Sequence, residues 1–533
     1  MRSIYFSDEH EQFRRTVRQF VEAEVAPHAD AWEAARRIPR EVFRRMGEMG
    51  FLGILFPEGL GGSGGDVFHA IAFLEELPRS RMGGFCAAVS VQEFIATGAL
   101  HKRGSRALQE RYLVPSIEGR KVGAICISEP DTGSDVAAIR TSAVRDGDAW
   151  IVNGAKTWIT NGAEGDFYVV ACKTERDAGA GGISLIAMDS DLPGIKASRL
   201  RKMGWHSSDT AEIVFEDVRV PAANLVGREN RGFAYIMETF ALERLVAAAI
   251  SVGACAFGLE ETLRYMQSRA AFGRPIVKFQ ALRHRMADLY AELEAVRQLT
   301  YHAGWLWQQG LPAVRECAMA KLLATELNKK VADEGLQFFG GFGYVEEYPM
   351  ERFYRDARVS TIVAGTSEIM REIVGKADLD GLTFGPLAEE EDEGAEEAEA
   401  VAEAVAPAAP PIPAPAPAAG PPALPETLPE LFAALPARLR PEKTEGWTSR
   451  FHFRFKGSAT PEWTVLVDGP RCEVSQGLAG TPDCVVTTTE AVYLGIEKGT
   501  QNPQTAFLTG KVKVSNIAEM TRYIKAFRPL FAR

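Results

Sequence analysis

The sequence has no two cysteines at the spacing of a metal site or a compact disulfide framework. Its seven cysteines lie far apart along 533 residues. An odd and scattered set favours a reducing compartment over a disulfide-stabilised fold. We interpret these residues as small buried apolar side chains and expect no metal centre. They are Cys86, Cys126, Cys172, Cys255, Cys317, Cys472 and Cys484.

Long apolar runs are also missing. No stretch approaches the roughly 20 consecutive apolar residues that span a bilayer, so no transmembrane segment is expected. Residues 1–25 place acids and arginines among apolar residues at helical spacing, without the apolar block and cleavage site of a signal peptide. Their acids also disfavour a transit peptide. The expected location is the cytoplasm.

The sequence does not contain the basic clusters that bind nucleic acid. The formal net charge is −11, and residues 386–406 alone hold nine acids and no lysine or arginine. The rest of the chain is therefore close to neutral, which disfavours a nucleic-acid partner. With 46% hydrophobic and 25% charged residues, the composition is that of an ordinary globular protein.

The chain is too long for a single hydrophobic core, and its pattern changes along its length. Residues 1–122 are expected to be helical, because apolar residues recur every three or four positions. Residues 123–232 contain short β-rich runs between Gly, Asp and Asn turns, which is typical of an antiparallel barrel or sandwich. Residues 233–384 return to long amphipathic helices, among them Gln280–Gln308 and Ala313–Phe339. The β-rich runs are Trp150–Val152, Phe167–Cys172, Ile183–Met188 and Glu212–Phe215.

A tether and a small domain are expected after these regions. Residues 385–427 join an acidic run to an Ala- and Pro-rich stretch. Such a segment cannot bury enough apolar surface to offset its ordering entropy, so we expect a disordered linker. A coil of about 40 residues spans roughly 35 Å. Residues 428–533 are expected to form a compact α/β unit that closes with an amphipathic helix at 516–531. Its other expected elements are a helix at Leu428–Leu439 and strands at Ser449–Phe455, Trp463–Val467 and Cys484–Thr488.

Four segments between residues 126 and 369 carry the chemistry. The first two are rich in Gly and hydroxyl residues at the ends of expected strands, which suits backbone and hydroxyl contacts with a flat polar heterocycle. The third contains an arginine that offers a fixed cation for a pyrophosphate. The segments are Cys126–Asp135; Asn153–Gly162; Arg269–Gly273, with Phe279 and Gln280; and the run Gly340–Tyr344, Glu347–Pro349, Arg355–Arg358 and Gly365–Ile369.

The order and spacing of these segments resemble the acyl-CoA dehydrogenase family over residues 1–383. The resemblance implies an N-terminal α-helical domain, a central β-barrel and a C-terminal four-helix bundle. It also implies noncovalent FAD, a homotetramer or homodimer, and transfer of electrons to electron-transfer flavoprotein. The substrate would be a saturated acyl-CoA, oxidised to a trans-2-enoyl-CoA.

The resemblance also assigns roles to individual residues. Some should flank the flavin ring, with Ser128 as a hydrogen-bond donor, and others should hold the pyrophosphate and adenine across a subunit boundary. Ser134 matches a position that meets CoA. The residues expected beside the flavin are Ile125, Cys126, Ile127, Ser128, Trp158 and Thr160. Those expected at the pyrophosphate and adenine are Arg269, Phe272, Gln280, Gln337, Gly340 and Gly341, with Thr366 and Glu368 near the same cofactor. The expected substrate-binding residues are Ser134, Arg244, Ala364 and Gly365.

The catalytic base departs from the commonest family pattern. The reaction needs a carboxylate to remove the α-proton of the thioester, and many members carry this glutamate just before the Gly-Thr of the fourth segment. This chain has Ala364 there, which cannot accept a proton. Either the protein does not react, or the base lies elsewhere. Glu243, followed by Arg244, occupies the helical position that the isovaleryl-CoA and long-chain subfamilies use, so we predict Glu243 as the base. The backbone N–H of Ala364 would still donate to the thioester oxygen.

The last region resembles the sterol carrier protein type-2 family over residues 428–533. The resemblance rests on Leu466–Asp468, Pro482–Cys484 and Ala506–Val514, with the closing helix. It implies an apolar tunnel for a lipid or fatty acyl ligand; an ordinary core without a ligand is the alternative. Two further readings of the whole chain stay open, an acyl-CoA oxidase that reduces oxygen and a lipid-binding scaffold that no longer reacts.

Overall fold

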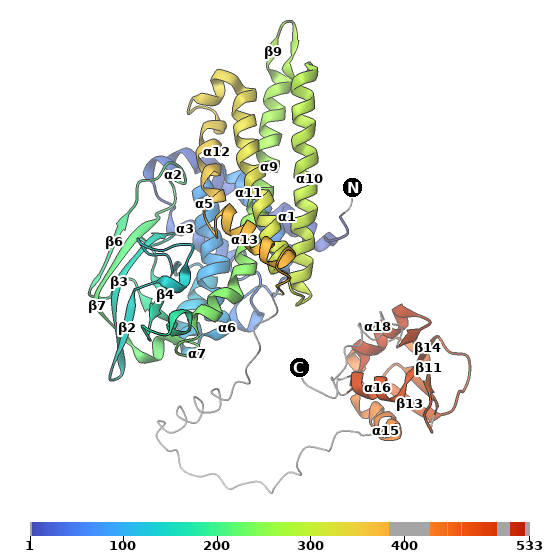
Figure 1. Ribbon diagram of the computed structural model, residues 1–533. Helices are drawn as coiled ribbons and strands as arrows, with labels where there is room; N and C mark the ends of the chain where they lie inside the picture. Colours follow the sequence, from blue (N-terminus) through green and yellow to red (C-terminus); the bar gives the residue numbers. More distant parts are fainter. Residues whose placement is uncertain (1–2, 383–426, 445, 460, 498–511, 528–533) are drawn as a thin grey trace. The chain divides into compact units, whose positions relative to one another are not determined.

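The computed structural model describes residues 3–382, 427–444, 446–459, 461–497 and 512–527 (Figure 1). The chain divides into two compact units, Met1–Glu397 and Ala398–Arg533. Most of the expected linker, residues 385–426, lies outside the described residues. Each unit is considered by itself.

The first unit begins with short helices, as the apolar periodicity predicts. The ends of α5 and α6 are joined by a π-helical turn, η5 (Val91–Ala96), so that residues 83–103 form one continuous helical stretch. The helix α4 is apolar on nearly every side because other helices surround it. These helices are α1 (Asp8–Phe20), α2 (Ala29–Ala35), α3 (Arg40–Glu48), α4 (Val67–Glu76), α5 (Gly83–Ser90), α6 (Gly98–Arg103), α7 (Arg106–Leu108) and α8 (Val114–Ile117).

A sheet of eight strands follows. Seven of them lie in the order β6-β7-β3-β2-β4-β5-β8, and β1 pairs with β4 in parallel. All other pairs are antiparallel except the single β2–β4 contact. The strands are β1 (Gly123–Cys126), β2 (Ser142–Asp146), β3 (Ala149–Ile159), β4 (Phe167–Lys173), β5 (Ile183–Asp189), β6 (Ile195–Arg199), β7 (Ala211–Pro221) and β8 (Leu225–Val226).

Strand β4 joins two hydrophobic cores, because its residues alternate between the two faces of the sheet. Phe167 and Val169 pack on the helical side, where Tyr112 belongs to the same core. Tyr168 and Val170 pack with the residues that face them from the other strands. Every residue of β4 is buried, so the sheet and the helices form one continuous interior.

Long helices complete the first unit. Helices α9, α10 and α11 run side by side, with the β9–β10 hairpin at one end (Figure 1). The extent of α10 is the one expected from the sequence, and α11 begins one residue later than expected. The elements are α9 (Gly232–Ser268), β9 (Ala270–Ala271), β10 (Arg274–Pro275), α10 (Gln280–Gln308), α11 (Val314–Phe339), α12 (Pro349–Ala357) and α13 (Ser367–Asp378).

Two helical stretches are long and apolar enough to cross a membrane by length and composition alone. They are Gly83–Arg103 and Gly232–Ser268, and 78% and 56% of their most apolar windows are buried inside the protein. Core helices of globular proteins pass the same test, so packing accounts for much of this apolar character.

The second unit is a five-stranded sheet covered by helices. Its strand order is β13-β12-β11-β14-β15, with β11 and β14 parallel. Phe451, Phe453 and Phe455 face the core from β11, as their alternation predicts. Strand β13 and helix α16 were not expected. The closing helix ends at Ala526, and residues 528–531 of its predicted range lie outside the described residues. The elements are α15 (Leu428–Arg438), β11 (Thr448–Lys456), β12 (Glu462–Asp468), β13 (Arg471–Gln476), β14 (Cys484–Thr489), α16 (Glu490–Glu497), β15 (Lys513–Val514) and α18 (Ile517–Ala526).

Candidate active site

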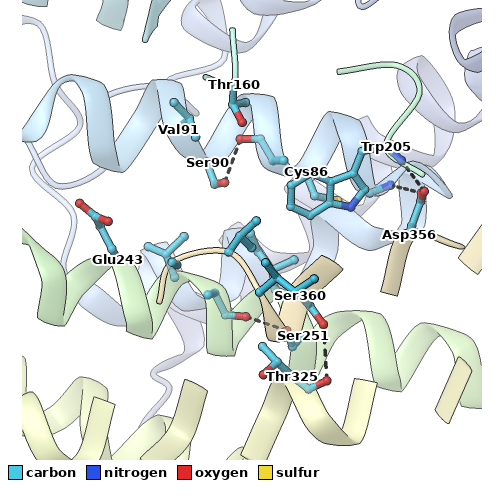
Figure 2. A pocket seen from close by; sticks show the side chains of 18 of the residues that line it. Cys86, Ser90, Val91, Thr160, Trp205, Glu243, Ser251, Thr325, Asp356 and Ser360 are labelled. Carbon is cyan, nitrogen blue, oxygen red and sulfur yellow. Dashed lines mark hydrogen bonds between the residues drawn. The ribbon is translucent and has the colours of Figure 1, made fainter. Parts of the chain in front are cut away.

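A cavity of about 560 Å³ lies in the first unit, between the ends of β1 and β3 and the helices α5, α9 and α11 (Figure 2). Its size is that of a small-molecule or cofactor site. The cavity brings together residues that are more than 200 positions apart in the sequence. The predicted site residues in its lining are Ile125, Ile127, Ser128, Ser134, Trp158, Thr160, Glu243, Arg244, Ala364, Gly365 and Thr366.

Glu243 is a buried carboxyl group in the cavity wall, in the fourth turn of α9 and 9% exposed. Burial raises its pKa to about 7, against the lowering effect of a hydrogen bond from Thr239 and of the Arg244 charge. The Thr239 hydroxyl donates to Oε1 at 3.2 Å. Arg244 lies over the Phe240 ring, 5.4 Å from its centroid, and burial lowers the pKa of this guanidinium. A carboxyl that ionises near neutral pH has the properties of a general base.

The wall formed by the sheet is held by a buried ion pair. Lys156 Nζ donates to the Ile127 carbonyl at 2.9 Å and to Glu129 Oε1 at 2.8 Å, and the Lys156 side chain is fully buried. Glu129 also accepts the backbone N–H groups of residues 140 and 141. Thr157 N–H donates to the Ser128 carbonyl at 3.0 Å. These bonds fix the end of β1 to β3, and so fix Ser128 at the cavity.

Trp158 is turned into the cavity by an irregularity in β3. The β3–β7 register shifts between Lys156 and Ile159, and Trp158 adopts a left-handed backbone with φ of 62°. A β-bulge of this kind redirects a side chain. The indole is 67% exposed although it lines a cavity, which leaves a broad aromatic face open to a ligand.

Free backbone donors surround the cavity. The N–H groups of Ser128, Thr160, Ala364 and Gly365 donate to no acceptor within the described residues. Ala364 and Gly365 both have left-handed φ angles, 53° and 86°. Lys321 Nζ holds this loop by donating to the Gly365 carbonyl at 2.7 Å, and burial lowers the pKa of Lys321 to about 8. All four residues are half-buried, so their N–H groups are open to the cavity and can donate to the acceptor atoms of a ligand.

These features fit the isoalloxazine ring that the sequence implied. A flavin is flat and apolar over its faces, with several acceptor atoms along its polar edge. The cavity offers the Trp158 ring and apolar walls for the faces, and the N–H groups of Ser128 and Thr160 for the edge. Ala364 and Glu243 line the same cavity.

Not every predicted residue reaches this cavity. The Cys126 side chain is fully buried in the sheet core, on the face of β1 opposite to Ile125 and Ile127, so only its backbone can contribute. Glu368 is exposed on the first turn of α13.

A second group of predicted residues gathers where α9, α10 and α11 end, around the β9–β10 hairpin (Figure 1). The Arg269 guanidinium lies 5.5 Å from the Phe342 ring centroid, and Phe272 is 96% exposed. A side chain built on either glycine of this group would meet open space. Contact between this group and a cofactor of another subunit stays a prediction. The members are Arg269, Phe272, Gln280, Gln337, Gly340 and Gly341, of which none lines the cavity.

Sequence patterns did not reveal the residues that support the site. Lys156 stands inside the second segment and Glu129 inside the first, but only the fold shows that the two form an ion pair. The apolar stripe of α9 was readable: Ala247, Ile250 and Ala254 follow Glu243 at helical spacing and line the cavity with it.

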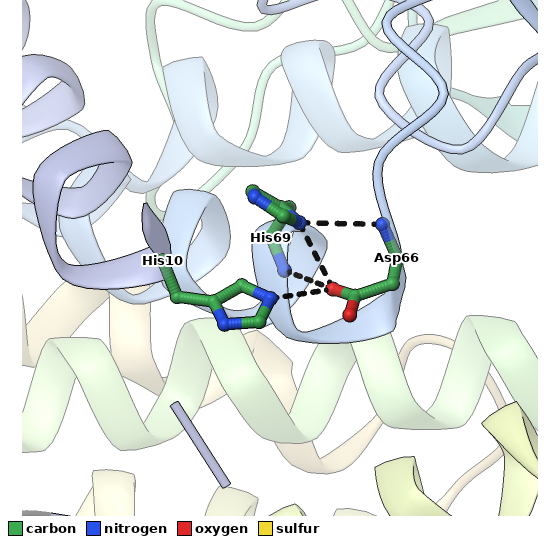
Figure 3. A group of neighbouring side chains, drawn as sticks. All are labelled: His10, Asp66 and His69. Carbon is green, nitrogen blue, oxygen red and sulfur yellow. Dashed lines mark hydrogen bonds and ion pairs between the residues drawn. The ribbon is translucent and has the colours of Figure 1, made fainter. Parts of the chain in front are cut away.

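A second cluster of titratable groups lies away from the cavity, where α1 and α4 begin (Figure 3). His10 Nε2 lies 2.8 Å and His69 Nδ1 2.9 Å from Asp66 Oδ1. Three ligand atoms so close can suggest a metal. However, Ser7 N–H donates to His10 Nδ1 and Asp66 N–H to His69 Nδ1, and Asp66 Oδ1 also accepts from two backbone N–H groups of α4. The cluster is accounted for as a joint N-terminal cap of two helices.

Comparison with known proteins agrees with this geometry. Models of the N-terminal, middle and C-terminal domains of acyl-CoA dehydrogenase match residues 7–120, 124–218 and 230–379. A model of the SCP-2 sterol transfer family matches residues 430–527. All three dehydrogenase domains are therefore present in one chain, in the usual order.

Individual relatives point the same way. The mitochondrial long-chain specific acyl-CoA dehydrogenase of Mus musculus is 39% identical over 374 residues, which are 70% of this chain and 86% of that protein. The acyl-CoA dehydrogenase of Geobacillus kaustophilus has a TM-score of 0.69 at 39% identity, covering 70% of this chain and 99% of its own. A glutaryl-CoA dehydrogenase from Mycobacterium smegmatis in complex with FADH2 has a TM-score of 0.67 at 29% identity, covering 71% and 96%. The chain therefore belongs to the acyl-CoA dehydrogenase family and carries a domain of the SCP-2 sterol transfer family.

Proposed function

We propose that this protein oxidises a saturated acyl-CoA to the trans-2-enoyl-CoA, with Glu243 as the base. The observation that carries the proposal is a buried carboxyl group with a pKa of about 7, facing a cavity rimmed by free backbone donors. The familiar loop position holds Ala364. Two carboxyl groups line the cavity, Glu243 and Asp356. The oxygens of Asp356 accept the backbone N–H groups of Gly83 and Trp205. Glu243 is therefore the carboxyl group that we assign to take the α-proton.

Several residues of the chain contribute to the proposed reaction. Bound FAD, the cofactor of this family, supplies the acceptor for the β-hydride. Glu243 accepts the α-proton, and Arg244 beside it keeps a positive charge near the carboxylate. The Ala364 N–H donates to the thioester oxygen, where negative charge develops as the proton leaves. Lys321 keeps Ala364 in place through the Gly365 carbonyl. The apolar walls exclude water and so strengthen these interactions.

The remaining predicted residues support a cofactor shared between subunits. The group around Arg269 is exposed and lies at the far end of long helices, where another subunit can reach it. We propose that this group binds the pyrophosphate and adenine of a neighbouring subunit's FAD, in a homotetramer or homodimer. Ser134 is exposed at the cavity mouth, which suits contact with CoA.

The direct test is anaerobic mixing of the purified flavoprotein with a series of acyl-CoA substrates, followed by absorbance. Bleaching of the flavin band supports dehydrogenation, and an unchanged band with every substrate means that the chain is a binding protein. Turnover with electron-transfer flavoprotein and without peroxide release separates a dehydrogenase from an oxidase. We propose electron-transfer flavoprotein as the acceptor and the cytoplasm as the location.

For the second unit we propose a lipid or fatty acyl ligand. The support is its match to the SCP-2 sterol transfer family and its strongly aromatic core, in which Phe432 stacks on Trp463 and Tyr493. Displacement of a fluorescent fatty acid from the full-length protein, compared with a chain ending at residue 383, tests this binding. The shorter chain is a sound control. The solved acyl-CoA dehydrogenase of Geobacillus kaustophilus is matched along 99% of its own length by 70% of this chain, so it is complete without such a unit.

A further inference from the structure

One wall of the active-site cavity is polar at a point far from the reacting groups. Four polar side chains line this part: Ser251 of α9, Thr325 of α11, Asn328, which follows Thr325 by three residues on the same face of α11, and Ser360 of the short turn η12 (Arg358–Thr361). They are between 1% and 9% exposed, and all of them line the cavity. Figure 2 shows Ser251, Thr325 and Ser360 gathered on one side of it. We call these four residues the polar corner.

The three hydroxyl groups of the polar corner can only accept a hydrogen bond from a ligand. Ser251 donates its single hydroxyl hydrogen to the Ala247 carbonyl at 2.8 Å, Thr325 to the carbonyl of residue 321 at 2.8 Å, and Ser360 to that of residue 357 at 2.7 Å. Each oxygen keeps a free lone pair. A bare hydrocarbon chain leaves these lone pairs without a donor.

Asn328 is the member that calls for a ligand. Its side chain is 6% exposed, and its amide makes no hydrogen bond within the described residues, with Oδ1 fully buried and unsatisfied. A buried amide without partners costs about 1–3 kcal/mol, so such groups are rare unless something binds to them. The amide brings both donors and an acceptor. Together with the three hydroxyl oxygens, it matches a group that donates and accepts at once, which is a hydroxyl.

The position of the polar corner along the cavity shows which part of the substrate reaches it. Ser251 follows Glu243 by eight residues on α9, which is about 12 Å along the helix. The cavity continues to Phe257, about 21 Å from Glu243. Opposite this stripe, α5 presents the small side chains Cys86 and Ala87, which leave room for a bulky group. The polar corner therefore meets the distal part of the acyl group and not the α and β carbons.

We propose that the preferred substrate carries a hydroxyl group on the distal part of a long or bulky acyl chain, bound by Asn328 with Ser251, Thr325 and Ser360. This inference rests on the proposed dehydrogenation, because it assigns the far part of the same cavity. A site that hydrogen-bonds a hydroxyl rejects the analogue without it far more strongly than an apolar pocket rejects a shorter chain.

The test measures binding without turnover. The Glu243→Gln holoenzyme is titrated with pairs of acyl-CoA thioesters from octanoyl to hexadecanoyl, one member unsubstituted and one with a terminal hydroxyl, and the flavin absorbance reports the dissociation constant. At the chain length that reaches the polar corner, the hydroxylated member is expected to bind at least about tenfold more tightly. Equal or weaker binding of the hydroxylated member at every length overturns the proposal.

Variants assign the preference to residues. In the Glu243→Gln protein, a second substitution Asn328→Leu, which keeps a side chain of similar volume, is expected to remove the preference for the hydroxylated thioester. Ser360→Ala in the same background is expected to reduce that preference. Ser90→Ala, on the α5 side of the cavity, should leave the ratio unchanged. If the leucine variant does not fold, the Ser360→Ala ratio decides: an unchanged ratio counts against the polar corner. If unsubstituted substrates bleach the wild-type flavin but no pair shows a preference, this inference fails and the proposed function stands. If no acyl-CoA bleaches the wild-type flavin, the proposed dehydrogenation is itself wrong.

Discussion

Glu243 is defined by its surroundings more than by its residue type. It is buried among apolar side chains, receives one hydrogen bond from Thr239, and has a neighbouring cation in Arg244. We expect Glu243→Gln to retain FAD but to reduce its flavin with acyl-CoA at least about 100-fold more slowly, because a general base contributes 10²–10⁴-fold. Stopped-flow absorbance of the bleaching step measures this directly.

The matched control for this substitution is Glu238→Gln, five residues earlier on α9. Glu238 pairs with Arg103 at 3.0 Å near the surface and does not line the cavity. It should bleach at the wild-type rate. A normal bleaching rate in Glu243→Gln itself would remove this carboxylate from the mechanism.

The same carboxyl group predicts a pH profile. Burial raises the pKa of Glu243 to about 7, and only the ionised form can accept the α-proton. The rate of flavin reduction at low substrate should therefore rise about tenfold per pH unit below 7 and level off above it. Acyl-CoA concentrations well below saturation report the free enzyme. A profile that stays level down to pH 5 contradicts the assignment.

For single residues, the sequence predicts functional side chains that one segment identifies. It misses side chains whose role depends on residues elsewhere in the chain. Glu243 was predicted from the resemblance to the isovaleryl-CoA and long-chain subfamilies, whose pattern matches both the arginine that follows it and Ala364 at the loop position. No sequence motif identifies Asn328, because the sequence alone does not distinguish a buried asparagine from any other polar residue of a helix. Its meaning depends on Ser360 and Ser251, which only folding brings near it.

Strands β1 and β3 are held together by the buried Lys156–Glu129 pair. Replacing Lys156 by Met leaves Glu129 buried without its counter-charge, and breaking a buried pair costs about 3–5 kcal/mol. We expect a clear fall in the thermal unfolding midpoint and weaker binding of FAD. Adding Glu129→Gln should restore part of the stability, because it removes the uncompensated charge.

Lys196→Met provides the matched control for that prediction. Lys196 pairs with Glu216 at 2.7 Å on the neighbouring strands, but both side chains are more than half exposed. An exposed pair contributes about 0–1 kcal/mol to stability, so the thermal unfolding midpoint of this variant should be close to that of the wild type. Equal melting of the two lysine variants would mean that the buried pair does not hold the cavity wall.

The hairpin between α9 and α10 tests the shared cofactor site. Arg269→Met is expected to weaken FAD binding by about tenfold or more, because a hydrogen bond to a charged group contributes about 1.5–3 kcal/mol. The flavin-to-protein absorbance ratio after dialysis measures the loss. Arg274→Met is the control on the same hairpin, since the Arg274 guanidinium lies over the Phe279 ring at 4.2 Å. Full retention of FAD in Arg269→Met would exclude a pyrophosphate contact.

Some element boundaries followed from local patterns, whereas the full lengths of β3 and β7 and the strand pairing did not. The apolar periodicity of α10 gave its extent, and alternation on β11 placed three phenylalanines in the core. The parallel pairing of β1 with β4 joins residues about 40 positions apart, with no turn signal between them. Strand β13 was missed because only two of its residues, Cys472 and Val474, alternate towards the core, and the other four face solvent.

The whole chain joins a dehydrogenase unit to a domain of the SCP-2 sterol transfer family through residues that the structure does not describe. The sequence predicts this segment to be an Ala- and Pro-rich tether, which would keep the second unit near the active site at an effective concentration of about millimolar. Such a tether helps most when the substrate is scarce in water. Soluble short acyl-CoA needs no such help.

A chain ending at residue 383 therefore separates the two roles. With octanoyl-CoA in buffer, its kcat/KM should equal that of the full-length protein within about twofold, because the cavity is complete within residues 78–369. With hexadecanoyl-CoA held in lipid vesicles, kcat/KM of the shorter chain should fall at least about fivefold, since capture by an attached domain is lost. Adding the full-length Glu243→Gln protein supplies the same domain from a separate chain and should restore little of the loss. Equal rates of the two chains on vesicles would mean that the second unit serves a ligand unrelated to turnover.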